Sequence, residues 1–145
     1  MKKCLSLLFL SFFYVNFSYA GFEGSGKITL NETVLKYFKE YLDPKDHNAS
    51  EGASRHGKGW YFFISESGEE FGYTYCPQGK QCVLDPVPAR NACKKNVKKY
   101  LKRSEKCYLF AKQRTIKWGG QKIRIPKKAT ESEIENILRE SGFID

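Results

Sequence analysis

The chain has 145 residues, of which 41% are hydrophobic and 15% aromatic, a length and composition typical of one small globular domain with a modest core. Its 25 Lys and Arg residues outnumber 16 Asp and Glu residues, which gives a net charge of +9 at pH 7. No segment beyond residue 20 is apolar enough to span a bilayer, so we expect no transmembrane segment after processing.

The first twenty residues predict a secretory signal peptide. Two lysines form its positive start, Leu5 to Val15 is its apolar stretch, and Ser18-Tyr19-Ala20 is a small-x-small cleavage site. A transmembrane anchor is the alternative, but the apolar stretch is too short and Asn16 interrupts it. We therefore expect an exported protein, periplasmic or secreted, with a signal peptide at residues 1–20.

Cleavage of the signal peptide would remove Cys4 and leave four cysteines: Cys76, Cys82, Cys93 and Cys107. An even number of cysteines in an exported chain is typical of disulfide bonds. Zinc binding is the alternative, but no C-x-x-C pair occurs, and the cysteines are separated by 5, 10 and 13 residues. We predict disulfides, with no metal and no cofactor.

Residues 21–59 predict a helix followed by a loop. Residues 21–26 are small and flexible, and residues 28–30 predict a short strand. Asn31 is a suitable cap for a helix whose apolar positions recur at helical spacing, namely Val34, Leu35, Phe38, Tyr41 and Leu42. Residues 43–59, rich in Gly, Ser and Asn, predict a flexible surface loop.

An antiparallel hairpin is predicted next. Trp60 to Ile64 is an unbroken aromatic and β-branched run, typical of a strand that is covered on both faces or central in a sheet. Ser67-Gly68 predicts a turn, and the aromatic residues of 71–76 then alternate with smaller ones. Gly72 would allow an aromatic ring to pack closely across the strand.

A basic helix is predicted over residues 89–103. Its apolar stripe consists of Ala89, Cys93, Val97, Tyr100 and Leu101. Seven cations, which no acidic residue of the helix offsets, lie opposite or flank this stripe: Arg90, Lys94, Lys95, Lys98, Lys99, Lys102 and Arg103.

This helix also suggests how the cysteines pair. Cys93 faces the core, where Cys107 can reach it from the start of the next strand, and a tight turn at residues 77–80 favours a bond between Cys76 and Cys82. Four cysteines allow three pairings, and the sequence by itself leaves all three open.

The rest of the chain predicts short strands and a helix. Residues 107–112 predict a strand with Cys107, Leu109 and Ala111 on one side, and Gln113-Arg114 and Gly119-Gly120 predict turns. Residues 122–126 predict an edge strand. Thr130-Glu-Ser-Glu133 is a capping box for an acidic helix, which would pack against the domain or lie on the basic segment.

Together these elements predict an α+β fold. We expect a small antiparallel sheet of four to five strands, a basic helix pinned to it by a disulfide, and N- and C-terminal helices. The disulfide-stabilised domain would comprise residues 21–128, and residues 129–145 would form a C-terminal helical appendage.

Several cysteine and aromatic motifs carry a resemblance. They are Gly72-Tyr-Thr-Tyr-Cys76, Ala89-x-x-x-Cys93, Cys107-Tyr-Leu-Phe-Ala111 with Ile116-Lys-Trp118, and a terminal helix that ends in Gly142-Phe143. With these motifs the mature chain resembles small secreted four-cysteine proteins of uncharacterised function from alphaproteobacteria. The resemblance implies export across a bacterial inner membrane and pairing of neighbouring cysteines, and it implies no catalytic residue.

Candidate catalytic residues are few. His47 and His56 could act in phosphodiester cleavage, or could bind a metal with Asp46, but they lie in a glycine-rich loop that offers no rigid support. The carboxylates of Glu66, Glu69 and Glu70 surround a turn, where such groups are normally solvated rather than paired across a glycosidase cleft. No G-x-S-x-G, H-E-x-x-H or phosphate-loop pattern occurs. We therefore name no catalytic residue.

Charge distribution favours a binding function instead. Residues 90–128 contain 15 Lys and Arg residues against the single Glu105. A solvated helix face is the simplest interpretation of this charge. The functional hypothesis is a small, non-enzymatic binding domain whose basic helix engages an anionic envelope polymer, nucleic acid without sequence specificity, or a protein partner. The alternative is a small secreted hydrolase, first of all a nuclease, that uses the loop histidines.

Overall fold

The computed structural model describes residues 22–43, 59–76 and 85–145. Within these residues the chain forms the helices α1 (Glu32–Leu42), α2 (Val87–Asn96) and α3 (Glu131–Glu140), and a π-helical turn, η4 (Val97–Leu101), continues α2. The strands of the same residues are β1 (Gly59–Ser65), β2 (Phe71–Tyr75), β3 (Cys107–Lys112), β4 (Thr115–Ile116) and β5 (Ile123–Arg124). They form one antiparallel sheet in the order β2-β1-β3-β4-β5, which confirms the predicted α+β class.

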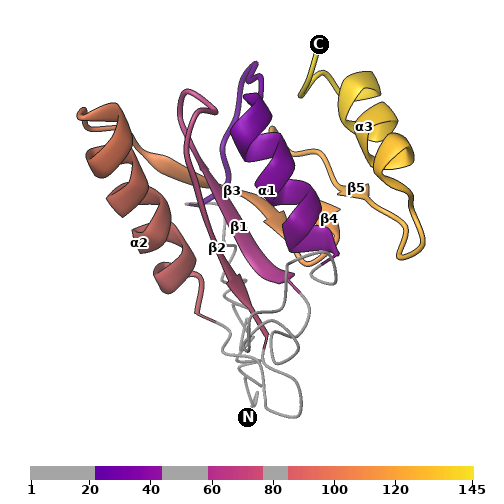
Figure 1. The fold of residues 1–145 in the computed structure, drawn as a ribbon, viewed down its shortest axis with the longest axis horizontal. Coiled ribbons are helices and arrows are strands. Elements are labelled where there is room, and N and C mark those ends of the chain that lie inside the picture. The colour runs from indigo at the N-terminus through magenta and orange to yellow at the C-terminus, as the bar shows by residue number, and fades with distance from the viewer. Residues whose placement is uncertain (1–21, 44–58, 77–84) are drawn as a thin grey trace, which may run out of the picture.

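Helices cover both faces of this sheet (Figure 1). On one face, Ala89 and Cys93 of α2 and Val97 of η4 are buried against the strand residues Phe63 and Leu109. On the other face, α1 and α3 pack on a larger core, which includes Val34, Phe38, Phe62, Ile64, Phe110, Ile134, Leu138 and Phe143. Successive residues of a strand point to opposite faces, so the apolar run of the central strand β1 supplies both cores, as predicted.

A β-bulge in β3 breaks the predicted alternation. Phe62 pairs with Ala111 and Phe63 with Leu109, so Phe110 is an extra residue between these two pairs. Phe110 and Ala111 therefore both belong to the core under α1, whereas Cys107 and Leu109 belong to the core under α2. The prediction that Ala111 lies on the side of Cys107 and Leu109 is wrong, because period-two alternation fails at a bulge.

A disulfide and a close backbone contact hold α2 on the sheet. Cys93 and Cys107 form the predicted disulfide, with Cα atoms 6.2 Å apart. Gly72 of β2 lies directly under the helix, where a Cβ atom would be 2.5 Å from the carbonyl oxygen of Ala89 and would also meet the backbone nitrogen of Cys93. The close approach that we predicted for an aromatic ring is thus made by the helix backbone.

The starts of α1 and α3 form as predicted. Asn31 accepts a hydrogen bond from the backbone N–H of Val34 at 2.8 Å, and Thr130 and Glu133 form a reciprocal capping box. Residues 28–30 do not form the predicted strand. They lie beside the C-terminal segment, where the N–H of Leu30 donates to the carbonyl of Phe143 at 2.8 Å.

Helix α3 packs beside α1, on the face of the sheet opposite α2 (Figure 1). The ammonium of Lys39 in α1 bridges two carboxylates of α3, Glu131 at 3.0 Å and Glu135 at 2.7 Å. Of the two placements considered for the acidic helix, packing against the domain is the observed one, and α3 does not cover the basic helix. No helix in the described part of the chain is long and apolar enough to cross a membrane.

Candidate functional site

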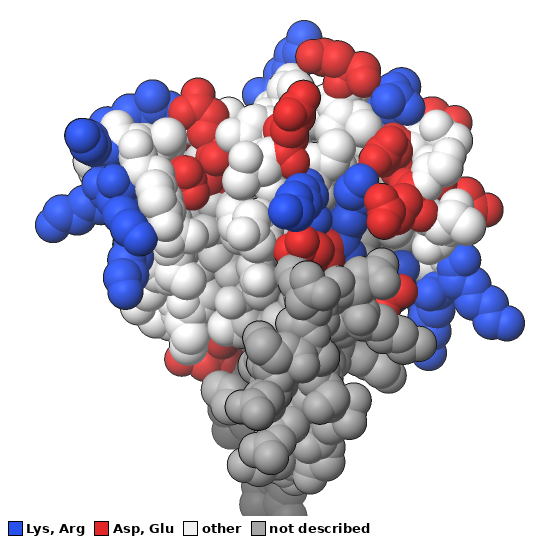
Figure 2. Space-filling view, viewed as in Figure 1, with Lys and Arg blue, Asp and Glu red and all other residues white. Residues whose placement is uncertain are grey.

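Five lysines define the exposed side of α2, η4 and the residue after them: Lys94, Lys95, Lys98, Lys99 and Lys102. We call them the lysine face. Figure 2 shows cationic side chains gathered along the outer side of α2. Because a helix rises 1.5 Å per residue, Lys94 and Lys98 lie about 6 Å apart along its axis, and so do Lys95 and Lys99. The helix therefore presents two rows of positive charge to the solvent.

The other two cations of the predicted site have protein partners. The guanidinium of Arg90 lies over the ring of Phe22, 5.1 Å from its centroid, and the side chain is only partly exposed. Arg103 donates to Glu69 at 3.1 Å and also to Glu105. The sequence places Glu69 far from the helix, so the neutralisation of Arg103 by this carboxylate follows from the fold alone.

Tyr100 lies among the lysines and not in the core. Its side chain is 57% exposed, although the predicted apolar stripe included it. The physical reason is η4: a π-helix has i→i+5 hydrogen bonds and turns less per residue than an α-helix. In η4, the step of four residues from Val97 to Leu101 makes about one turn, so Val97 and Leu101 both face the core between the helix and the sheet. Tyr100 then lies on the solvent side.

Lys99 contacts this tyrosine directly. Its ammonium lies 4.6 Å from the ring centroid of Tyr100 and donates to the phenol oxygen at 2.9 Å. This hydrogen bond raises the pKa of Lys99, so the ammonium keeps its charge at physiological pH. The site is thus an exposed ring within a cluster of lysines.

The long basic segment of the sequence is divided by the fold. Lys122, Arg124, Lys127 and Lys128 are also exposed, but they lie in β5 or within a few residues of it, at the opposite edge of the sheet from β2, over which α2 packs. Charged residues on an edge strand prevent pairing with other chains, which gives this second group a structural role. At the β2 edge, the side-chain amide of Asn96 in α2 donates a hydrogen bond to the backbone carbonyl of Phe71 at 2.8 Å.

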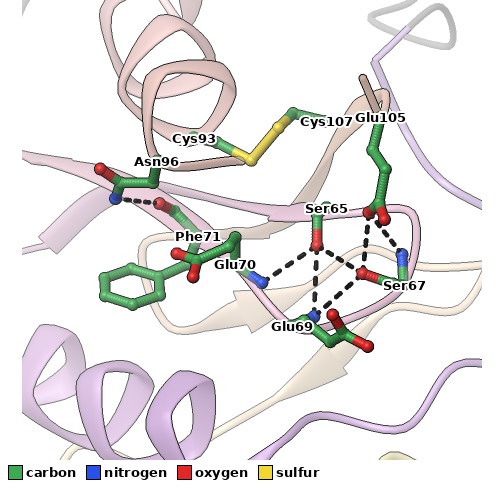
Figure 3. The surroundings of a disulfide bond; sticks show 9 residues. All are labelled: Ser65, Ser67, Glu69, Glu70, Phe71, Cys93, Asn96, Glu105 and Cys107. Carbon is green, nitrogen blue, oxygen red and sulfur yellow. Dashed lines mark hydrogen bonds between the residues drawn. A yellow bond between two sulfur atoms is a disulfide. The ribbon is translucent and has the colours of Figure 1, made fainter. Parts of the chain in front are cut away.

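A hydrogen-bond network fixes the end of the basic helix next to the disulfide (Figure 3). At its centre is the buried hydroxyl of Ser65, which accepts from the backbone N–H groups of Glu69 at 3.2 Å and Glu70 at 3.0 Å. The same hydroxyl lies 3.1 Å from that of Ser67, which donates to Glu105 at 2.7 Å. The β1–β2 turn and the segment between η4 and β3 are thereby joined.

Glu105 is ionised within this network. Burial alone disfavours the charge of this carboxylate, but hydrogen bonds from Ser67 and Arg103 outweigh burial and lower its pKa. In the nearby turn, burial and the charge of Glu69 raise the pKa of Glu70. The Glu69 carboxylate pairs with Arg103, and the backbone N–H of Glu70 donates to Ser65, so these two residues take part in the scaffold of the hairpin turn.

Several predicted residues lie outside the described part of the chain. They are His47 and His56, on which the hydrolase hypothesis depends, and Asp46, the third candidate metal ligand. Cys76 is disulfide-bonded, and Cys82, its predicted partner, is also outside the described residues. Within residues 22–43, 59–76 and 85–145, no cluster of three or more His, Cys, Asp or Glu side chains has the arrangement of a metal site.

No protein-family model, curated protein or solved structure matches this chain. The function must therefore be argued from the geometry and the electrostatics of the site itself.

Proposed function

We propose that this protein is an exported, non-enzymatic binding domain that engages an anionic polymer through the lysine face of α2 and η4. One observation carries the proposal: the side chains of Lys94, Lys95, Lys98 and Lys102 form no ion pair or hydrogen bond with the described part of the chain. Lys99 contacts only its neighbour Tyr100 there. The face is therefore not part of the internal salt-bridge network of the fold.

The energetics of the helix support this proposal. Like charges spaced four residues apart destabilise a helix, and α2 has no acidic residue in its first turn, although Asp85 just before it accepts a hydrogen bond from the N–H of Val87 at 2.9 Å. Lysines near its C-terminal end do interact favourably with the helix dipole, but the repulsion between the rows remains. The disulfide and the contact at Gly72 keep the helix folded despite that repulsion, and a bound polyanion would relieve it.

Charge reversal on the two basic groups provides a matched test. The triple variant Lys94→Glu, Lys98→Glu, Lys102→Glu should elute from heparin-agarose at a much lower salt concentration than the wild type. The control variant Lys122→Glu, Lys127→Glu, Lys128→Glu has the same net charge but leaves the lysine face intact. It should elute near the wild type.

The comparison between the two variants decides the outcome. Equal losses of retention in both variants would mean that net charge alone drives binding, and unchanged retention of the first variant would exclude the lysine face. A polyanion that binds this face should also raise the melting temperature of the wild type more than that of the first variant.

Export is part of the same proposal. The disulfide between Cys93 and Cys107 favours an oxidising compartment, in agreement with the signal peptide and with the resemblance to small exported four-cysteine proteins. Intact-mass measurement of the protein from a periplasmic fraction should find a chain that begins at Gly21 and contains no free thiol. A cytosolic product that retains residues 1–20 would contradict it.

A further inference from the structure

The exposed ring of Tyr100 points to the class of polymer that the lysine face binds. We infer that the ligand is single-stranded nucleic acid, with a base stacked on Tyr100 and the neighbouring phosphates bound by the lysines. This inference rests on the proposed function, which requires only that the polymer be anionic, and adds an aromatic group that the polymer must contain.

The geometry of η4 supports a stacking contact. The ammonium of Lys99 lies at the hydroxyl end of the ring, 2.9 Å from the phenol oxygen and 4.6 Å from the ring centroid, and Tyr100 is 57% exposed, so ring surface is open to a planar group. Lys98 and Lys102 are exposed on either side of Tyr100 in the chain, and therefore within reach of the phosphates that flank a stacked base. Proteins that bind single strands without sequence preference combine these two features, an aromatic platform and a cationic surface along the backbone.

The π-helical turn η4 determines the position of Tyr100. A continuous α-helix would bring it toward the sheet with the rest of the predicted stripe, whereas the π-helical turn turns it to the solvent. Single π-helical turns are rare and occur frequently at functional sites. The turn ends at Lys102, which has a left-handed backbone with φ 53°, an uncommon conformation for a residue with a side chain.

Other anionic ligands make poorer use of this site. A polymer without aromatic groups, such as polyphosphate, would engage the lysines and leave the tyrosine unused. An anionic membrane requires a continuous apolar face, but the large apolar side chains exposed in the described chain are Tyr100 and Val87. They lie near opposite ends of the helix, about 20 Å apart along its axis.

Two oligomers of equal charge separate stacking from electrostatics. One is a fluorescein-labelled 15-nucleotide oligo(dT), and the other is an abasic oligomer of the same length, which keeps the sugar and phosphate groups. By fluorescence anisotropy at fixed salt, the wild type should bind oligo(dT) about tenfold more tightly than the abasic oligomer, as expected for one stacked base.

Variants of the ring provide the controls. Tyr100→Ala should bind both oligomers with the affinity of the wild type for the abasic one, and Tyr100→Phe should retain the preference for oligo(dT). The slope of log affinity against log salt should be the same in all three proteins, because the number of lysine–phosphate contacts does not change. The ring is exposed, so the melting temperature of Tyr100→Ala should be close to that of the wild type.

The failure of this inference is distinct from failure of the proposed function. Equal wild-type affinity for the two oligomers, with weaker binding of both by the Lys94, Lys98 and Lys102 charge-reversal variant, would overturn the stacking inference and leave anion binding intact. If the charge-reversal variant bound both oligomers as tightly as the wild type, the stacking inference and anion binding by the lysine face would both be excluded. Binding to phosphatidylglycerol vesicles but not to oligo(dT) would replace the nucleic acid by a membrane surface.

Discussion

Substitution of Gly72 by alanine should push the basic helix away from the sheet and destabilise the fold. A Cβ atom at this position would lie 2.5 Å from the carbonyl oxygen of Ala89 and 2.8 Å from the carbonyl carbon of Ala92, and would also meet the nitrogen of Cys93. These are all backbone atoms of α2, so no side-chain rotation can relieve the overlap. The helix as a whole must move.

The size of the effect follows from the required movement. Ordinary contact begins at 3.4 Å, so the distance from the new methyl group to Ala89 must increase by about 0.9 Å, and the distance to Cys93 by more. Such a shift opens the interface of Ala89, Cys93 and Val97 with the sheet, while the disulfide to Cys107 limits how far the helix can adjust. Insertion of a methyl group into a packed core costs about 1–3 kcal/mol, and we expect about 3 kcal/mol here because the atoms that must give way are backbone.

Equilibrium unfolding in urea measures this cost directly. The mature protein with its disulfides intact can be followed by the fluorescence of Trp60 and Trp118, with the variant Thr74→Ala as a control on the same strand. Thr74 is partly exposed, and its substitution should change the free energy of unfolding by less than about 1 kcal/mol. If Gly72→Ala is within 1 kcal/mol of the wild type, the helix does not rest on this glycine.

Three further changes test the rest of the scaffold. Replacing Cys93 and Cys107 by alanine should lower the free energy of unfolding by about 3 kcal/mol, measured in urea, because the bond closes a loop of fifteen residues in the unfolded chain; a loss below 1 kcal/mol would contradict this. Arg114→Lys should cost about 2 kcal/mol by the same assay, because one ammonium cannot replace a guanidinium that donates to the carbonyls of Leu42, Ile125 and Pro126; an unchanged midpoint would contradict it. Glu105→Gln should lower the free energy of unfolding by about 1 kcal/mol at pH 7. Melting curves at several pH values should show that this difference from the wild type disappears as the pH falls below 4.5, the ordinary pKa of the carboxyl.

The sign of the last prediction follows from the lowered pKa of Glu105. A carboxylate whose pKa is lower in the folded state than in the unfolded state stabilises the fold above its unfolded pKa and loses that contribution as it is protonated. Glu70 has a raised pKa and contributes in the opposite direction, but it is present in both proteins and cancels in the comparison. If the difference in stability between Glu105→Gln and the wild type stays constant down to pH 3, the negative charge of Glu105 does not contribute to stability.

Local sequence patterns determined the elements of this fold that depend on neighbouring residues. The cap at Asn31, the capping box at Thr130 and Glu133, and the turns around Gly68, Gly119 and Gly120 follow from side chains or backbone freedom within a few residues. The apolar run of β1 likewise indicated a strand buried on both faces, and Cys93 was placed toward the sheet by its helical spacing.

Contacts between segments far apart in the sequence decided which of these expectations are correct. The bulge at Phe110 and the π-helical turn at Val97–Leu101 each add a residue to a regular repeat, which moves Ala111 to the other face and Tyr100 to the surface. Periodicity cannot reveal them, since each is set by packing against a neighbouring element. The same holds for charge: residues 90–128 are one basic segment in the sequence, but the fold separates the lysine face from the cations near β5 and pairs Arg103 with a carboxylate 34 residues away.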